Sequence, residues 1–195
     1  MTNKRVLARS NLFFCVLVQL RLEQSEGFSL ITTSTISGVS KDELFDFIAT
    51  PANWPSIVAS SHSVKKPSDQ FNDINQALDV GDKVEEIFGL PPILPLSVLW
   101  ECVVKDERNG DLKFYSKTGV PNFAENCWMN FSFSELDALS GPVKTKVQLV
   151  MEYEALNPLI TVATPVLNID NALALKVLLP LAAKAEMRFK RMDVW

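Results

Sequence analysis

The sequence predicts a single α+β domain, in which an antiparallel sheet of about seven strands has one apolar face and a long C-terminal helix covers that face. Three observations support this prediction. A β-rich stretch is followed by signals for two short helices, residues 61 to 155 alternate apolar and polar side chains between turns, and residues 171 to 192 repeat apolar residues at helical spacing. With 195 residues, 47% of them hydrophobic, the chain can bury one core.

The first strand and the first helix are predicted from residues 28 to 49. Residues 28 to 37 are rich in β-branched side chains and stop at Gly38. Ser40 and Glu43 have the spacing of a capping box, and Val39 and Leu44 that of a hydrophobic staple. We therefore expect a helix to begin directly after Ser40.

A sharp break follows this helix. Pro51 restricts Thr50 to extended geometry and ends the helix, while Pro55 suits the first turn of a second short helix. Trp54 lies between the two prolines. We expect it to fill the angle between the two short helices.

Six further strands are expected in an antiparallel meander, over residues 61–66, 82–88, 96–107, 111–117, 125–135 and 144–155. Asn109 and Gly110 mark a tight hairpin within it. Alternation gives the sheet one apolar face, with Glu101, Lys113 and Glu152 among the residues expected in water. The residues of the apolar face are Val98, Trp100, Cys102, Val104, Leu112, Phe114, Ser116, Cys127, Met129, Phe131, Phe133, Val147, Leu149, Met151 and Tyr153.

The C-terminal helix is expected over residues 171 to 192, with Asp170 as its N-cap and a kink at Pro180. Such a helix needs an apolar surface to lie against, and the apolar face of the sheet supplies one. Its own apolar face is predicted to consist of Leu173, Leu175, Val177, Leu178, Leu181, Ala182, Ala185 and Met187.

Charge and motifs exclude several classes of function. A formal net charge of -4 and a pI of about 5.1 argue against nucleic-acid binding. We assign the basic cluster Lys184, Arg188, Lys190 and Arg191 to the negative end of a helix dipole, the alternative being a membrane or partner patch. No stretch is expected to reach the length of apolar residues needed to span a bilayer.

Metal and nucleophile motifs are absent from the sequence. Cys15, Cys102 and Cys127 form no C-x-x-C pair, which indicates neither a zinc site nor a disulfide framework and favours a reducing compartment. The one histidine, His62, lies among serines in an expected strand, where a surface imidazole is a better interpretation than a catalytic base. We expect no metal and no cofactor.

Residues 1–26 are expected to be an N-terminal extension to a domain of residues 27–195. Lys4, Arg5 and Arg9 precede the apolar run 12–20, which is the pattern of a signal peptide or an organelle presequence. Arg21 and the absence of a small-x-small cleavage site argue against secretion. A presequence and an extra element lying on the domain both remain open, so the expected location is cytoplasmic or organellar.

Glu86 is the sharpest single candidate for a functional residue. If Val84 and Phe88 point inward, Glu86 also points inward, where burial would raise its pKa and allow it to bind a polar ligand group or to transfer protons. In the alternative register Ile87 is inside and Glu86 is in water. Weaker candidates for polar contacts in the same interior are Tyr153, Ser116 and Thr118.

Two loops, residues 89–95 and 118–125, carry more apolar residues than a solvated turn needs. Ile93, Leu94, Val120 and Phe123 are therefore expected either to fold onto the core or to form the lips of an opening.

The order of the elements resembles the START-like (SRPBCC) superfamily, and most closely its polyketide cyclase/dehydrase and lipid-transport branch. The resemblance is carried by residues 36–61, 78–87, 94–119 and 145–155 and covers about residues 28–190. It implies a helix-grip fold, in which a curved sheet holds the C-terminal helix on its concave face around an apolar cavity. It also implies that the two apolar loops flank the entrance, and it supplies no shared catalytic residue.

On this basis we expect the domain to bind a hydrophobic or aromatic, lipid-like molecule between the sheet and the C-terminal helix. One alternative is an enzyme of the polyketide cyclase type, in which Glu86 and Tyr153 move protons. Another is an interaction protein whose core is filled by Trp100, Phe114, Phe131 and Phe133. The expected ligand contacts are Trp100, Cys102, Phe114, Met129, Phe131, Met151, Tyr153 and the helix residues Ala174 and Leu178.

Overall fold

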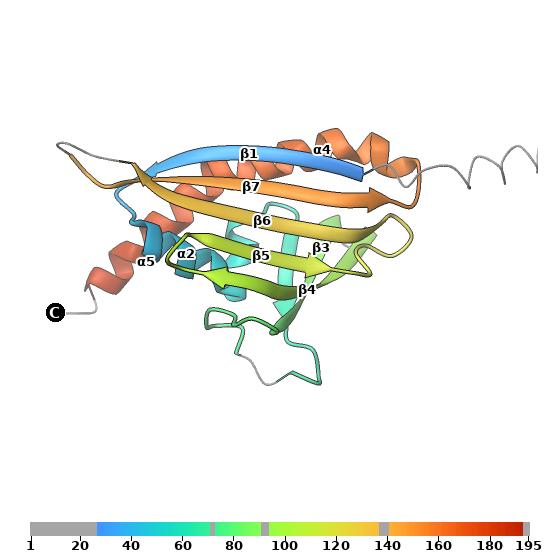
Figure 1. Ribbon diagram of the computed structural model, residues 1–195, viewed down its shortest axis with the longest axis horizontal. Helices are drawn as coiled ribbons and strands as arrows, with labels where there is room; N and C mark the ends of the chain where they lie inside the picture. Colours follow the sequence, from blue (N-terminus) through green and yellow to red (C-terminus); the bar gives the residue numbers. More distant parts are fainter. Residues whose placement is uncertain (1–26, 71–72, 91–93, 137–140, 193–195) are drawn as a thin grey trace, which may run out of the picture.

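The computed structural model describes residues 27–70, 73–90, 94–136 and 141–192 (Figure 1). The two interpretations of residues 1–26 lie outside these described residues. Within them, seven strands form one antiparallel sheet in the order β1-β7-β6-β5-β4-β3-β2, which confirms the predicted meander from β2 to β7. The strands are β1 (Gly27–Ser37), β2 (Ser61–Lys65), β3 (Lys83–Leu90), β4 (Leu94–Asp106), β5 (Asp111–Ser116), β6 (Ala124–Leu136) and β7 (Lys144–Ala155).

Three short helical segments and one long helix complete the domain. After β1 come α2 (Lys41–Ala49), the 3-10 turn η1 (Pro51–Asn53) and α3 (Trp54–Ile57). After β7, α4 (Leu159–Leu173), the π-helical turn η2 (Ala174–Leu178) and α5 (Leu179–Met192) follow one another without a break. The sheet curls around this long helix, which runs obliquely behind it (Figure 1). This is the predicted α+β helix-grip architecture.

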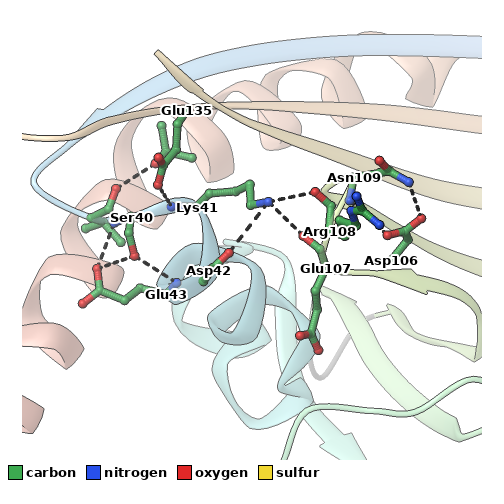
Figure 2. A network of polar contacts seen from close by, with 11 residues as sticks. Ser40, Lys41, Asp42, Glu43, Asp106, Glu107, Arg108, Asn109 and Glu135 are labelled. Atoms are coloured by element: carbon green, nitrogen blue, oxygen red, sulfur yellow. Dashed lines mark hydrogen bonds and ion pairs between the residues drawn. The ribbon is translucent and has the colours of Figure 1, made fainter. Parts of the chain in front are cut away.

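The start of α2 is fixed by the predicted capping box. The Ser40 amide donates to Glu43 Oε2 at 2.8 Å, and the Glu43 amide donates to Ser40 Oγ at 3.3 Å. Lys41 Nζ donates to the carbonyl oxygens of Glu107 and Arg108, at 2.9 and 3.1 Å, so the first turn of α2 is tied to the β4–β5 turn (Figure 2). The cap therefore sets both the start of the helix and its position against the sheet.

The corner after α2 places Trp54 in the core. Thr50 has the extended geometry expected before Pro51, and the Asn53 side chain donates to the Phe47 carbonyl oxygen at 2.9 Å. Trp54 is 3% exposed and meets the ring of Phe114 edge to face, with ring centroids 5.2 Å apart. The tryptophan thus links the helical corner to the middle of the sheet.

The inner face of the sheet is the predicted apolar face, with local exceptions. Val98, Trp100 and Cys102 are buried, but Val104 is only half-buried, because a bulge between Cys102 and Val104 breaks the alternation of β4. A second bulge lies between Glu125 and Trp128 in β6. At each bulge an extra residue shifts the side chains that follow it.

The long helix begins earlier than the sequence indicates. It starts at Leu159, not at residue 171, and the Leu159 amide is capped by Asn157 Oδ1 at 3.0 Å. Asp170 is therefore not an N-cap but an interior residue of α4. The prediction failed because Asp170 is a good capping residue, whereas residues 159–169 are rich in β-branched residues and contain Pro165.

The predicted apolar face of this helix is wrong in part. Leu175 and Met187 are buried, but Leu173, Val177 and Leu181 are 38%, 45% and 66% exposed. The extra residue of the π turn shifts the faces of the helix, which a regular 3.6-residue repeat cannot anticipate. The turn lies directly before Pro180, and within it the Leu179 amide bonds to the Ala174 carbonyl oxygen, five residues back.

By length and composition, the helix from Leu159 to Lys190 could cross a membrane, so the expectation that no stretch is long enough is wrong. In the structure, however, Leu175, Leu179, Ala183 and Met187 pack in the core of the domain. The inner side of the helix is therefore part of the core of the domain.

Candidate ligand-binding cavity

A cavity of about 250 Å³ lies between the inner face of the sheet and the long helix. Its sheet side is formed mainly by β4, β6 and β7, through Val98, Trp100, Met129, Phe131, Leu149 and Met151. Its helix side is formed by Ile160, Ala163, Leu167, Ala174, Leu175 and Leu179. Ala163 and Ala174 present short side chains to the sheet, which leaves space where larger residues would fill it.

The helical corner and the β5–β6 loop complete the wall. Trp54, Ile57 and Val58 contribute from α3 and the residue after it, and Val120 and Phe123 contribute from the predicted lip loop 118–125. In the other predicted lip loop, residues 91–93 lie outside the described residues. That the two loops flank an entrance stays a prediction.

The structure brings most of the expected ligand contacts to the cavity. Trp100, Met129, Phe131, Met151, Tyr153 and Ala174 line it. Cys102, Phe114 and Leu178 are not among its lining residues. Phe114 is covered by Trp54, and Leu178 belongs to the π turn, whose extra residue changes which side chains face the sheet. Contact with a ligand stays a prediction for all of the expected residues, whether or not they line the cavity.

Glu86 points inward from β3, so the register that places it in water is wrong. It is 8% exposed, and the Trp100 indole N–H donates to its Oε2 at 2.9 Å. Burial raises the pKa of the Glu86 carboxyl above its ordinary value; nearby Asp170 adds to the rise, and the Ser61 hydroxyl and Trp100 oppose it. Glu86 is thus a buried acid in an otherwise apolar wall.

Further polar groups line the cavity, and sequence reasoning missed them. Ser60 Oγ donates to Asp170 Oδ2 at 2.6 Å, and both residues line the cavity. Asn171 also lines it and is 9% exposed, with no hydrogen-bond partner for its Nδ2. The only local signal is that Asp170 and Asn171 are adjacent in an apolar stretch, and a helix cap is the ordinary interpretation of Asp170 there.

The amide of Asn171, whose Nδ2 has no hydrogen-bond partner, indicates what a bound molecule would offer. A buried donor without an acceptor costs about 1–3 kcal/mol, so an acceptor on a bound molecule would be favoured there. The Ser61 hydroxyl is buried beside Glu86 and likewise has no hydrogen bond of acceptable geometry, although it is near enough to oppose the rise in the Glu86 pKa. Glu86, Ser60, Asp170 and Asn171 line the cavity, and Ser61 lies beside Glu86 without lining it; we call these five residues the polar end of the cavity.

The other predicted polar candidates are satisfied locally. The Thr164 hydroxyl donates to the Ile160 carbonyl oxygen at 2.8 Å, so the Tyr153 hydroxyl is the donor in its 2.8 Å contact with Thr164. Ser116 Oγ accepts from the Gly119 amide at 3.1 Å. Thr118 is exposed, as is His62, whose Nε2 lies 3.0 Å from the Gly89 carbonyl oxygen.

No metal centre is formed by the residues that the structure describes, since none of their His, Cys, Asp and Glu side chains gather in groups of three or more. The chemistry available in the cavity is therefore that of carboxyl, amide, hydroxyl and indole groups against an apolar wall.

No protein-family model and no curated protein matches the chain. Solved structures do match. Major latex-like protein 151 from Panax ginseng has a TM-score of 0.55 at 16% identity, covering 83% of this chain and 95% of its own. TTHA0849 from Thermus thermophilus has a TM-score of 0.62 at 12% identity, covering 82% of this chain and 99% of its own.

A third match is the di-domain ARO/CYC protein BexL from the BE-7585A biosynthetic pathway, with a TM-score of 0.55 at 16% identity. The match covers 77% of this chain and 46% of BexL. At such identities these similarities bear on the fold alone. Together with the strand order and the long helix held by the curved sheet, they show that the chain has the helix-grip fold, which the resemblance to the START-like (SRPBCC) superfamily predicts.

Proposed function

We propose that this domain binds a hydrophobic small molecule carrying one polar group, with the apolar body among Trp100, Met129, Phe131 and Met151 and the polar group at the polar end. The observation that carries the proposal is the cavity itself, whose wall is apolar except for a few polar side chains. The cavity favours a ligand-binding protein over the alternative of an interaction protein whose core is filled.

The polar end indicates the chemistry of that group. Asn171 Nδ2 needs an acceptor, whereas the carboxyls of Glu86 and Asp170 accept hydrogen bonds. A hydroxyl both accepts and donates, so an alcohol or phenol matches this end better than a hydrocarbon does. A carboxylate is disfavoured, because a third acidic group would lie beside two others.

An acid–base enzyme of the polyketide cyclase type is the second candidate. The raised pKa of buried Glu86 favours it, because a carboxyl that keeps its proton can act as a general acid. Tyr153 is less suited to proton transfer, since its hydroxyl is already engaged with Thr164. Turnover of a polyketide substrate that Glu86→Gln abolishes would establish this activity.

Binding is tested with 2-naphthol and naphthalene as probes, by calorimetry and fluorescence on the full chain. Ala163→Leu adds bulk inside the cavity, and Ala185→Leu adds the same bulk at an exposed position of the same helix. We expect Ala163→Leu to weaken both probes about tenfold or more and Ala185→Leu to leave both unchanged. Equal affinities in the two variants would remove the cavity as the binding site.

The polar end is tested separately with Asn171→Leu. We expect this variant to bind 2-naphthol about tenfold more weakly while naphthalene keeps its wild-type affinity, because only the phenol offers an acceptor to the amide. A parallel loss of both probes would show that Asn171 acts through packing and not through a hydrogen bond. Mass spectrometry of an extract of the purified protein would identify a molecule that copurifies with it.

A further inference from the structure

Along α4, several polar side chains of the long helix face the protein, while a row of apolar side chains faces solvent. Thr164 and Asp170 bond to Tyr153 and Ser60, and Asn171 is buried. The outward-facing apolar residues, between 38% and 74% exposed, form what we call the outer stripe: Leu159, Val162, Val166, Ile169, Leu173, Val177 and Leu181.

The outer stripe is continuous. Its members follow one another at intervals of three or four residues, which places them on one side of a helix. It is therefore a single surface and not a set of scattered apolar residues. A contiguous exposed apolar surface on a folded domain indicates a contact with a partner or a membrane.

Most of the charged residues along the long helix are positive. Between Leu159 and Leu181 the charged residues are Asp170, which bonds to Ser60, and the exposed Lys176. Beyond the stripe, Lys184, Arg188 and Lys190 are exposed. Residues 159–192 contain five Lys or Arg against two acidic residues, a net charge of +3 in a chain whose formal net charge is -4.

We propose that the outer stripe is a membrane-docking surface, which lies in the interface of an anionic lipid bilayer with the helix axis parallel to the bilayer plane. Apolar side chains of such a helix enter the boundary between headgroups and acyl chains, while lysine and arginine reach the phosphates. The helix lies on the bilayer and does not span it, because its other side belongs to the core.

A second copy of the chain fits this surface less well. Two paired outer stripes would cover the apolar residues but would leave the excess of basic residues on each helix without partners, because Asp170 already bonds to Ser60 and Glu186 already pairs with Lys190. An anionic bilayer satisfies both features of the stripe at once.

Docking would place the bilayer directly behind the cavity. Ala163, Leu167 and Asn171 line the cavity from the inner side of the helix that carries the outer stripe. The distance between the two is about one helix diameter, roughly 10 Å. Membrane binding nevertheless stands independently of the proposed ligand, because the outer stripe and the cavity are separate surfaces.

The test is co-sedimentation of the full chain with vesicles of phosphatidylcholine containing about 30 mol% phosphatidylserine, and with vesicles of phosphatidylcholine alone. Val166→Glu/Ile169→Glu adds two charges within the stripe. Thr161→Glu/Asn168→Glu adds the same charges at exposed polar positions of α4 and is the matched control. We expect the anionic vesicles to be bound more tightly, the stripe variant to lose about tenfold or more in partitioning, and the control to lose clearly less.

Three outcomes would overturn the proposal. The first is equal partitioning of the stripe variant and its control. The second is a dimer of the lipid-free wild type that the stripe variant dissociates, which would make a second copy the occupant. The third is a melting temperature that falls in the stripe variant far more than in the control without lipid, which would show that the stripe is covered within the chain itself.

Discussion

The indole N–H of Trp54 donates a hydrogen bond to the carbonyl oxygen of Ile48 at 2.8 Å. Ile48 lies in the last turn of α2, where carbonyl groups have no partner within the helix. The tryptophan therefore caps the helix that it follows while its ring packs on Phe114 and lines the cavity. One side chain ends the helix, joins it to the sheet and closes one side of the interior.

Trp54→Phe should separate the hydrogen bond from the packing. The variant keeps an aromatic ring but removes the donor to the Ile48 carbonyl, and we expect the free energy of unfolding to fall by about 1–3 kcal/mol. Trp128→Phe, at a half-buried position of β6, is the control, with an expected loss of about 1 kcal/mol or less. Urea unfolding measures both, and equal losses would contradict a capping role for Trp54.

Glu86→Gln should change how stability depends on pH. Because the pKa of Glu86 is raised in the folded state above its ordinary value of 4.5, the folded protein holds this proton more tightly than the unfolded chain. As the pH rises above 4.5, the unfolded chain releases the proton first, so the wild type loses stability through the folded-state pKa. Glutamine removes this loss and can still accept from Trp100.

The measurement is urea unfolding of wild type and Glu86→Gln from about pH 4 to about pH 8. The free energy of unfolding of the variant should increase relative to that of the wild type as the pH rises. A difference between the two that stays constant over this range would show that Glu86 has no raised pKa in the folded protein.

Gly110→Ala should destabilise the β4–β5 hairpin. Gly110 has a φ of +75°, and an added Cβ would collide with the carbonyl oxygen of Phe133. Gly81 has a φ of +95° with nothing within 4 Å of the added atom, so Gly81→Ala measures backbone strain alone. We expect the free energy of unfolding, measured with urea, to fall by about 1–2 kcal/mol in Gly81→Ala and by clearly more in Gly110→Ala. Equal losses would mean that the hairpin adjusts to the collision.

Cys102 and Cys127 should be unreactive in the native protein. Burial raises the pKa of each thiol to about 11, so little thiolate forms at about pH 8. We expect iodoacetamide to label both residues slowly in the native state and rapidly in urea, as measured by mass spectrometry of peptides. Equally fast labelling in both conditions would contradict the burial of these thiols.

The sequence predicted the sheet well because its signals are local. The Ser40–Glu43 capping box and the Asn109–Gly110 turn each depend on a few neighbouring residues, and both were found where expected. The inward orientation of Glu86 could not be decided in this way, because it depends on strand register. Pairing of Val84 with Trp100 and of Glu86 with Val98 resolves the register.

The long helix was predicted less accurately, because tertiary contacts outweigh its local signals. Asp170 has the side chain of an N-cap, but its partner is Ser60, 110 residues away in the sequence. For the same reason the polar end of the cavity was missed, except for Glu86. Spacing along one segment cannot show that Ser60, Glu86 and Asn171 line the same cavity.

The π turn η2 changes the direction in which the side chains of α5 point relative to those of α4. Each residue of a regular α-helix advances by about 100°, so one extra residue sets α5 back by about that angle relative to α4. This shift brings Leu179 and Ala183 onto the side of the helix that carries Asn171 and Leu167. If the same residues formed an uninterrupted α-helix, Asn171 and Ala183 would lie about 120° apart around its axis, and no rotation of that helix could keep Asn171 at the cavity and Ala183 in the core.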